Sequence, residues 1–102
     1  MGAIEFTEKG SGPDLQTAFH NAVEDSAHQN GHGGYTGSLA EKDSVTLIDS
    51  TIRPLKEAEQ LANQLIRHFD PRINDKWGPA GALEYTTDED TRSWIFFGFA
   101  SY

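Results

Sequence analysis

The sequence predicts an α+β domain, a two-layer sandwich in which two amphipathic helices cover one face of a mainly antiparallel sheet of about four to five strands. Two segments repeat apolar residues every three or four positions, as amphipathic helices do, and shorter segments alternate or are rich in β-branched and aromatic residues. The predicted order is strand, helix, two strands, helix, two strands. With 102 residues, the chain (1–102) is long enough for one domain with a single modest core.

The first strand and helix are predicted from the N-terminal third. Residues 3–8 alternate apolar and polar side chains, which predicts a half-buried strand with Ile4 and Phe6 inward. Residues 10–13 (Gly-Ser-Gly-Pro) are expected to end this strand, because Gly and Pro interrupt strands. A helix ending near Asn30 then carries an apolar stripe of Leu15, Ala18, Phe19, Ala22 and Val23.

The middle of the chain predicts two short strands and a second helix. Residues 36–41 indicate a short strand, and residues 45–48 (Val-Thr-Leu-Ile) indicate a strand more firmly. Ser50 or Thr51 is expected to cap a helix that begins near Pro54. The apolar stripe of this helix consists of Leu55, Ala58, Leu61, Ala62, Leu65, Ile66 and Phe69.

The C-terminal third predicts a hairpin. Residues 82–86 and 93–100 read as strands joined by the acidic turn 87–91. The last strand is apolar on both faces. It therefore lies either at the centre of the sheet or with one face covered by another subunit.

Composition limits the classes of function. The chain has no cysteine, which excludes disulfides, thiolate catalysis and cysteine-ligated zinc. It has no run of about 18 apolar residues, and its first residues do not resemble a signal peptide. We therefore expect a cytoplasmic protein that does not contact a membrane.

The net charge of −8 argues against direct nucleic-acid binding, because a phosphate backbone is bound by clustered Lys and Arg. The charge serves either solubility alone or attraction to a basic protein partner.

Two glycine-rich segments, residues 31–37 and 76–81, hold six of the ten glycines. Each also carries an aromatic residue, Tyr35 in the first and Trp77 in the second. Such segments are either tight connections or places where a ligand or partner approaches the main chain. The predicted binding residues are Gly33, Gly34, Tyr35, Thr36, Lys76 and Trp77, together with Asp88, Glu89 and Asp90 of the acidic turn.

Histidine chemistry gives a weaker candidate. His32 lies inside the first glycine segment beside Tyr35 and titrates near neutral pH, so it is the candidate general acid or base. His28 and His32 have the spacing of two metal ligands on a helix, but Asn30 and Gly31 are expected to end the helix between them. No metal and no cofactor are expected.

Residues 31–42 and 75–81, about a fifth of the chain, resemble segments of small, poorly characterised prokaryotic and phage proteins. The resemblance carries over no catalytic residue. Together with small size and acidity, it implies an inhibitor of a bacterial defence or nucleic-acid-handling complex.

Three functional hypotheses follow. The first is a non-enzymatic protein that binds a partner through the two glycine segments and the acidic turn. The second is a small-molecule-binding protein or minimal enzyme, with a pocket between the two glycine segments. The third is an assembly role, in which the apolar strand 94–99 forms a homo-oligomer interface.

Overall fold

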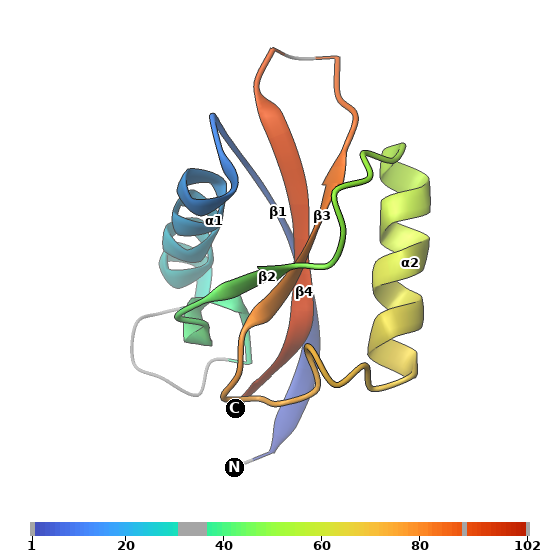
Figure 1. Ribbon diagram of the computed structural model, residues 1–102. Coiled ribbons are helices and arrows are strands. Elements are labelled where there is room, and N and C mark those ends of the chain that lie inside the picture. Colours follow the sequence, from blue (N-terminus) through green and yellow to red (C-terminus); the bar gives the residue numbers. More distant parts are fainter. Residues whose placement is uncertain (1, 31–36, 89, 102) are drawn as a thin grey trace.

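The computed structural model describes residues 2–30, 37–88 and 90–101. In chain order (Figure 1) the elements are β1 (Ala3–Gly12), α1 (Leu15–Asn30), the 3₁₀ turn η1 (Leu39–Glu41), β2 (Val45–Leu47), α2 (Leu55–Arg67), β3 (Ala80–Tyr85) and β4 (Arg92–Ser101).

The strands form one sheet in the order β1-β4-β3-β2. β4 pairs antiparallel with both neighbours, so that Phe6 of β1 lies opposite Gly98 and Leu83 of β3 lies opposite Ile95. The short edge strand β2 runs parallel to β3. The predicted α+β class, with a mainly antiparallel sheet, is confirmed.

The core is built on the two faces of the central strand β4. Trp94, Phe96 and Ala100 pack in one buried cluster with α1, whereas Ile95, Phe97 and Phe99 pack in a second cluster with α2. Successive side chains of a strand point to opposite faces, so the alternating residues of β4 separate the two clusters. Of the two alternatives for this strand, the central position is the one that the sheet order shows.

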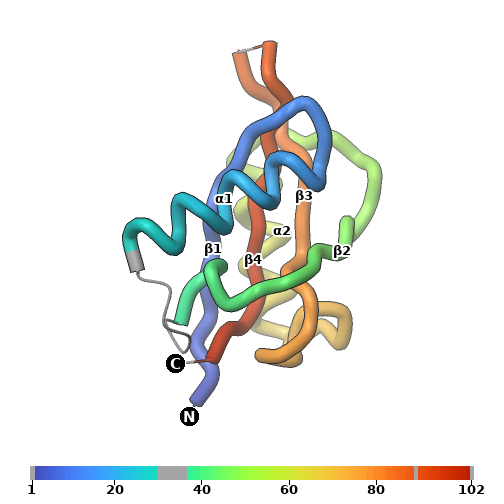
Figure 2. The backbone as a smooth tube through the Cα atoms, turned by 90° about the vertical axis from the view of Figure 1, so that its left-hand side faces the viewer, coloured from blue at the N-terminus to red at the C-terminus, as the bar shows by residue number. Residues whose placement is uncertain are grey.

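The helices therefore lie on opposite faces of the sheet, and the predicted placement of both on one face is wrong. Figure 1 shows the sheet between α1 and α2, and Figure 2 shows α1 in front of the sheet with α2 behind it. The physical reason is that both faces of β4 are apolar and each needs a cover. The chain's own helices thus cover both faces of strand 94–99, the strand for which a homo-oligomer interface is predicted.

Strand β1 is longer than predicted, because its glycines are packing residues rather than strand breakers. A Cβ at Gly10 would lie 2.7 Å from the carbonyl oxygen of Ala18, and one at Gly12 would lie 2.9 Å from the Ala18 nitrogen. Only glycine allows α1 to approach the strand this closely. Phe6 is buried as predicted, whereas Ile4 is 47% exposed.

Two local predictions around the second strand are also corrected. Within the predicted strand 36–41, residues Leu39–Glu41 form η1, whose cap Ser38 accepts a hydrogen bond from the Ala40 amide. The N-cap of α2 is Pro54, with no side-chain cap bond, rather than Ser50 or Thr51.

Candidate functional site

A compact turn formed by Asp75–Gly78, here called the Trp77 turn, overlaps the start of the second glycine segment. The Asp75 carboxylate accepts the amide hydrogen of Trp77 at 2.9 Å, and the Asp75 carbonyl accepts that of Gly78 at 2.9 Å. An Asp that bonds the backbone two residues ahead fixes the local chain direction. The turn thus has a defined shape before any partner binds.

Lys42, the residue directly after η1, donates hydrogen bonds from its buried ammonium to the main chain of this turn. Its Nζ donates to the carbonyl oxygens of Asp75 at 3.2 Å, Lys76 at 3.1 Å and Gly78 at 2.9 Å. Lys42 is only 3% exposed, and its ammonium lies 6.0 Å from the centre of the Phe6 ring. The lysine therefore ties the turn to the α1 side of the core.

The hydrogen bonds of Lys42 also define its chemical role. Burial lowers the pKa of the Lys42 ammonium, and the nearby charge of Asp75 opposes this change. A lowered lysine pKa in a cleft is often a sign of catalysis. Here the ammonium has three hydrogens and three carbonyl acceptors, so the group is engaged as a structural donor.

Trp77 projects from this turn into solvent, with 65% of the residue exposed. The ammonium of Lys76 lies 5.4 Å from the centre of its ring, within the range of a cation–π contact, and lies 3.5 Å from the Gly2 carbonyl. Trp77 therefore does not close the open end of the core. The turn presents an aromatic ring and a cation side by side.

The first glycine segment falls mostly outside the described residues. This holds for His32, Gly33, Gly34, Tyr35 and Thr36, the candidate residues at positions 31–36.

Its described end, Gly37, has a φ of 70° and donates its amide hydrogen to the Ser101 carbonyl at 2.8 Å. A positive φ favours glycine, as the glycine-rich pattern predicts. Residues 37–42 then lead from Gly37 through η1 to Lys42. Through Lys42, the residues that follow the first glycine segment therefore contact the second glycine segment.

The acidic turn lies far from the Trp77 turn. The Trp77 turn precedes β3, whereas Asp88 and Asp90 follow it, and the two turns lie at opposite ends of the hairpin (Figure 1). Six strand residues span about 20 Å. The Trp77 turn and the described residues of the acidic turn therefore lie apart, because the six residues of β3 separate them. Glu89 lies outside the described residues.

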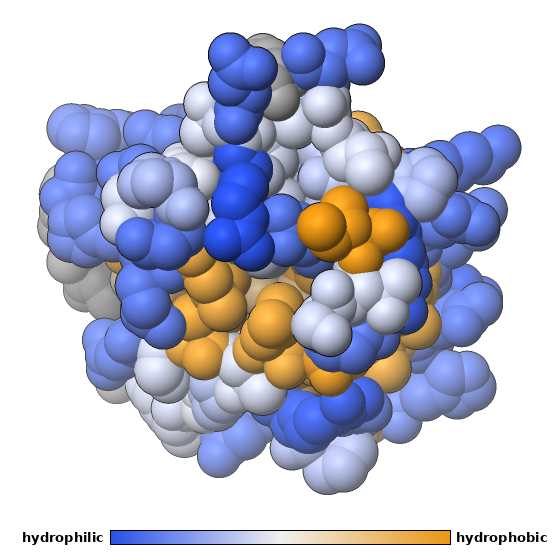
Figure 3. All heavy atoms as spheres, turned by 45° about the horizontal axis from the view of Figure 1, so that its top comes forward, coloured by the Kyte–Doolittle hydropathy of each residue, from blue (hydrophilic) through white to orange (hydrophobic). Residues whose placement is uncertain are grey.

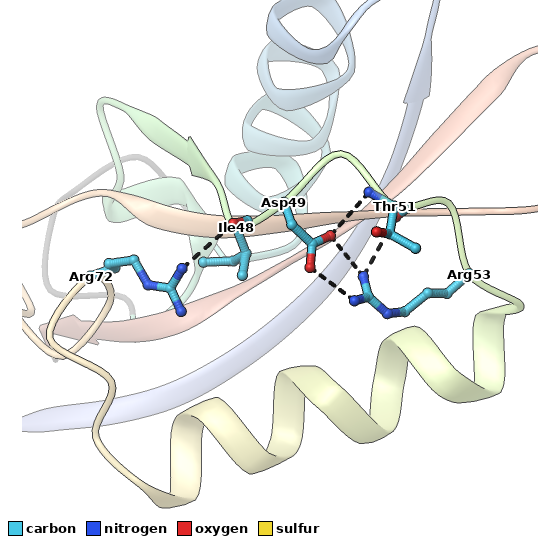
Figure 4. Close-up of polar contacts among 5 residues, drawn as sticks. All are labelled: Ile48, Asp49, Thr51, Arg53 and Arg72. Carbon is cyan, nitrogen blue, oxygen red and sulfur yellow. Dashed lines mark hydrogen bonds and ion pairs between the residues drawn. The ribbon is translucent and has the colours of Figure 1, made fainter.

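A second ordered polar cluster was not predicted from the sequence. Both Nη atoms of Arg53 lie 2.8 Å from the carboxylate of Asp49, which also accepts the Thr51 amide hydrogen (Figure 4). The hydrogen bonds from Arg53 lower the pKa of Asp49. Arg72 reaches the Ile48 carbonyl at 3.5 Å from the neighbouring loop.

This cluster lies where the chain bulges out from the edge of the sheet, next to β3. Ile48 donates to Ala82 and Arg53 to Glu84, so the residues between them leave the ladder and return to it. The bulge exposes Ile52. Figure 3 shows apolar side chains exposed among hydrophilic ones on one face of the molecule. An Asp and an Arg four positions apart predict a helical pair, so no sequence pattern indicated a bulge here.

The described ranges 2–30, 37–88 and 90–101 contain no group of three or more His, Cys, Asp or Glu that could hold a metal ion. Within these same ranges, no helix has the length and apolar character needed to cross a membrane. No protein family model, curated protein or solved structure matches this chain.

Proposed function

We propose that the protein is a non-enzymatic protein-binding module and that the Trp77 turn is its anchor. One combined observation carries the proposal. Trp77 is 65% exposed, and the turn that bears it is hydrogen-bonded to the buried Lys42. An aromatic ring held outward on an ordered support is suited to enter a pocket of a partner.

Two physical arguments support this anchor. Trp is among the residues that contribute most to protein–protein binding when it enters a desolvated pocket. A rigid turn also reduces the ordering cost of association, because the loop has already lost its conformational freedom. The hydrogen bonds of Asp75 and Lys42 provide this rigidity.

The charge of the chain suggests the class of partner. A net charge of −8 accelerates association with a basic protein and slows association with an acidic one. Proteins that handle nucleic acids present clustered Lys and Arg, so they are the partners that fit best. Inhibition of such a complex, which the resemblance of residues 75–81 implies, is one form of this proposal.

The acidic turn has a separate role in this proposal. Because Asp88 and Asp90 lie at the other end of the hairpin, they steer the approach of a basic partner rather than contact it beside Trp77. Steering changes the association rate constant, whereas loss of a buried anchor changes the dissociation rate constant.

The test compares the parent protein with Trp77→Ala and a matched control, Ile52→Ala. Ile52 is also a large exposed apolar residue, 53% exposed, but lies outside the Trp77 turn. Each protein is immobilised and exposed to a lysate of the natural host. A stoichiometric partner is then purified and its binding kinetics are measured. We expect Trp77→Ala to raise the dissociation rate constant at least about tenfold, whereas Ile52→Ala leaves it unchanged.

Neutralising Asp88, Glu89 and Asp90 together tests the steering role. We expect a lower association rate constant with less dependence on salt, and an unchanged dissociation rate constant. If Trp77→Ala retains every partner as well as the parent does, the Trp77 turn is not the anchor.

A further inference from the structure

Strand β1 has a long edge that no neighbouring strand uses. It is the outermost strand in the order β1-β4-β3-β2, and all ten of its residues pair with β4 on the other side. Within the described part of the chain, no strand pairs with its outer edge. Unpaired backbone N–H and C=O groups along such an edge are a template for a further strand.

The helices flank this edge without taking the position of a further strand. α1 and α2 lie in layers on opposite faces of the sheet, and β1 lies at its margin (Figures 1 and 2). Hollows follow the strand on both sides: one lies between Thr7 and Asn63 of α2, and another between Ser11 and Asn21 of α1. The Asn21 side chain donates to the Ser11 carbonyl at 3.2 Å, so the edge is open to an added strand up to that residue.

The side chains of β1 indicate which strand fits. Phe6 packs in the α1 cluster, so Glu5, Thr7 and Lys9 project from the opposite face, and all three are exposed. Glu5 and Lys9 have opposite charges and lie at equal distances on either side of Thr7. Charged side chains usually protect an edge strand, because a foreign strand rarely matches them.

An antiparallel copy of the same strand pairs Glu5 with Lys9, whereas Glu8 lies opposite Phe6 of that copy. With Thr7 opposite Thr7 of the second copy, Glu5 lies opposite Lys9 of that copy and Lys9 lies opposite its Glu5. Opposite charges and paired threonines are both favourable cross-strand pairs. In the same register Ile4, which is 47% exposed, lies opposite Gly10 of the second copy, on the face that α1 covers closely.

We infer that the protein forms a two-fold symmetric dimer through antiparallel pairing of β1 with β1 of a second copy, centred on Thr7. The pairing joins two four-stranded sheets into one continuous eight-stranded sheet. The same patch on both copies forms a closed, isologous interface, which consumes the open edge of each. This inference is independent of the Trp77 turn.

Charge reversal tests the register. Glu5→Lys alone or Lys9→Glu alone places like charges opposite each other at two symmetric positions. The double variant, Glu5→Lys with Lys9→Glu, restores opposite pairs. By sedimentation analysis, we expect each single variant to raise the dimer dissociation constant about tenfold or more, and the double variant to return it close to that of the parent.

A cross-link tests the two-fold centre directly. The chain has no cysteine, so Thr7→Cys introduces a single thiol. Directly opposite residues of an antiparallel pair have Cα atoms about 4.5–5.5 Å apart, within the range of a disulfide. We expect mild oxidation to give a covalent Thr7→Cys dimer, whereas Gln16→Cys, exposed on α1, stays largely monomeric.

Three outcomes would overturn the dimer through β1. The first is a parent protein that stays monomeric at high concentration, as expected if an unrelated extended segment uses the edge instead. The second is equal cross-linking of Thr7→Cys and Gln16→Cys. The third is a double charge variant that dimerises no better than the single ones. Trp77→Ala, in contrast, is expected to dimerise like the parent.

Discussion

The Nζ atom of Lys42 lies 2.9 Å from the carbonyl oxygen of Gly78, and this hydrogen bond joins residues 36 positions apart in the sequence. Lys42 is buried, whereas Trp77, one residue before Gly78, is exposed. A buried cation thus determines where an exposed aromatic ring is held. The stability of the fold and the geometry of the proposed anchor depend on the same side chain.

Replacing Lys42 by Met is expected to destabilise the protein. Met keeps an apolar stem of similar length but donates no hydrogen bond. Three carbonyl oxygens therefore lose the Lys42 hydrogen bond, and that of Asp75 keeps only the Gly78 amide. We expect the free energy of unfolding to fall by about 2–4 kcal/mol. Urea denaturation followed by circular dichroism measures this change. The matched control Lys56→Met, at an exposed lysine of α2, should be nearly neutral, and equal effects of the two variants would contradict the role of Lys42.

The sequence located the Trp77 turn but not the group that holds it. Glycines and an aromatic residue in residues 76–81 are a local pattern, and local patterns can be read directly. The tie from Lys42 depends on tertiary contact, and nothing in its neighbourhood distinguishes it from a solvated lysine. Buried lysines are rare, so sequence reasoning places such a residue at the surface.

Gly10→Ala tests the close approach of α1 to β1. The added Cβ would lie 2.7 Å from the Ala18 carbonyl oxygen and 2.9 Å from Cε2 of Phe96, so helix and strand must separate. We expect a loss of about 1–3 kcal/mol in the free energy of unfolding. Thermal and urea denaturation provide the measurement, with Gln16→Ala on the exposed face of α1 as the control. Unchanged stability in Gly10→Ala would mean that α1 moves away from β1 without any loss of stability.

The position of the helices illustrates a second limit of sequence reasoning. The apolar stripes of α1 and α2 show which side of each helix is buried, but not which face of the sheet it covers. The decisive signal was in β4, where apolar residues occupy both faces from Trp94 to Phe99. If no second subunit covers the sheet, two apolar faces and two amphipathic helices favour one helix on each face.

Glu8→Gln is expected to stabilise the protein near neutral pH. Burial raises the pKa of the Glu8 carboxyl above its ordinary value of 4.5, the charge of Asp25 adds to this rise, and a hydrogen bond with Ser26 opposes it. The folded state thus favours protonated Glu8. The protonated Glu8 carboxyl therefore contributes stability that is fully present below pH 4.5. This contribution is lost as the pH rises through the folded-state pKa of Glu8.

Because Gln resembles the protonated carboxyl, Glu8→Gln should have a higher melting temperature than the parent at about pH 7, and this difference should vanish at about pH 4. Calorimetry across this range provides the test, and Asp43→Asn, at an exposed acid, serves as the control. A gain that is independent of pH, or a loss at neutral pH, would contradict the assigned cause.

Phe69 provides the last prediction, because it combines an unfavourable backbone conformation with a favourable ring contact. Its φ of 51° lies in the left-handed region just after α2, where glycine is usual, and its ring stacks on Phe99 at 5.4 Å. Both Phe69→Ala and Phe69→Gly remove the stacking, but only Gly also removes the backbone strain. We therefore expect Phe69→Gly to be more stable than Phe69→Ala by roughly 1 kcal/mol.

At Arg67, the last residue of α2, the same pair of substitutions should give the opposite order, because Ala is the better helix former there. Urea denaturation of the four variants tests this reversal, and the same order at both positions would show that residue 69 carries no left-handed strain.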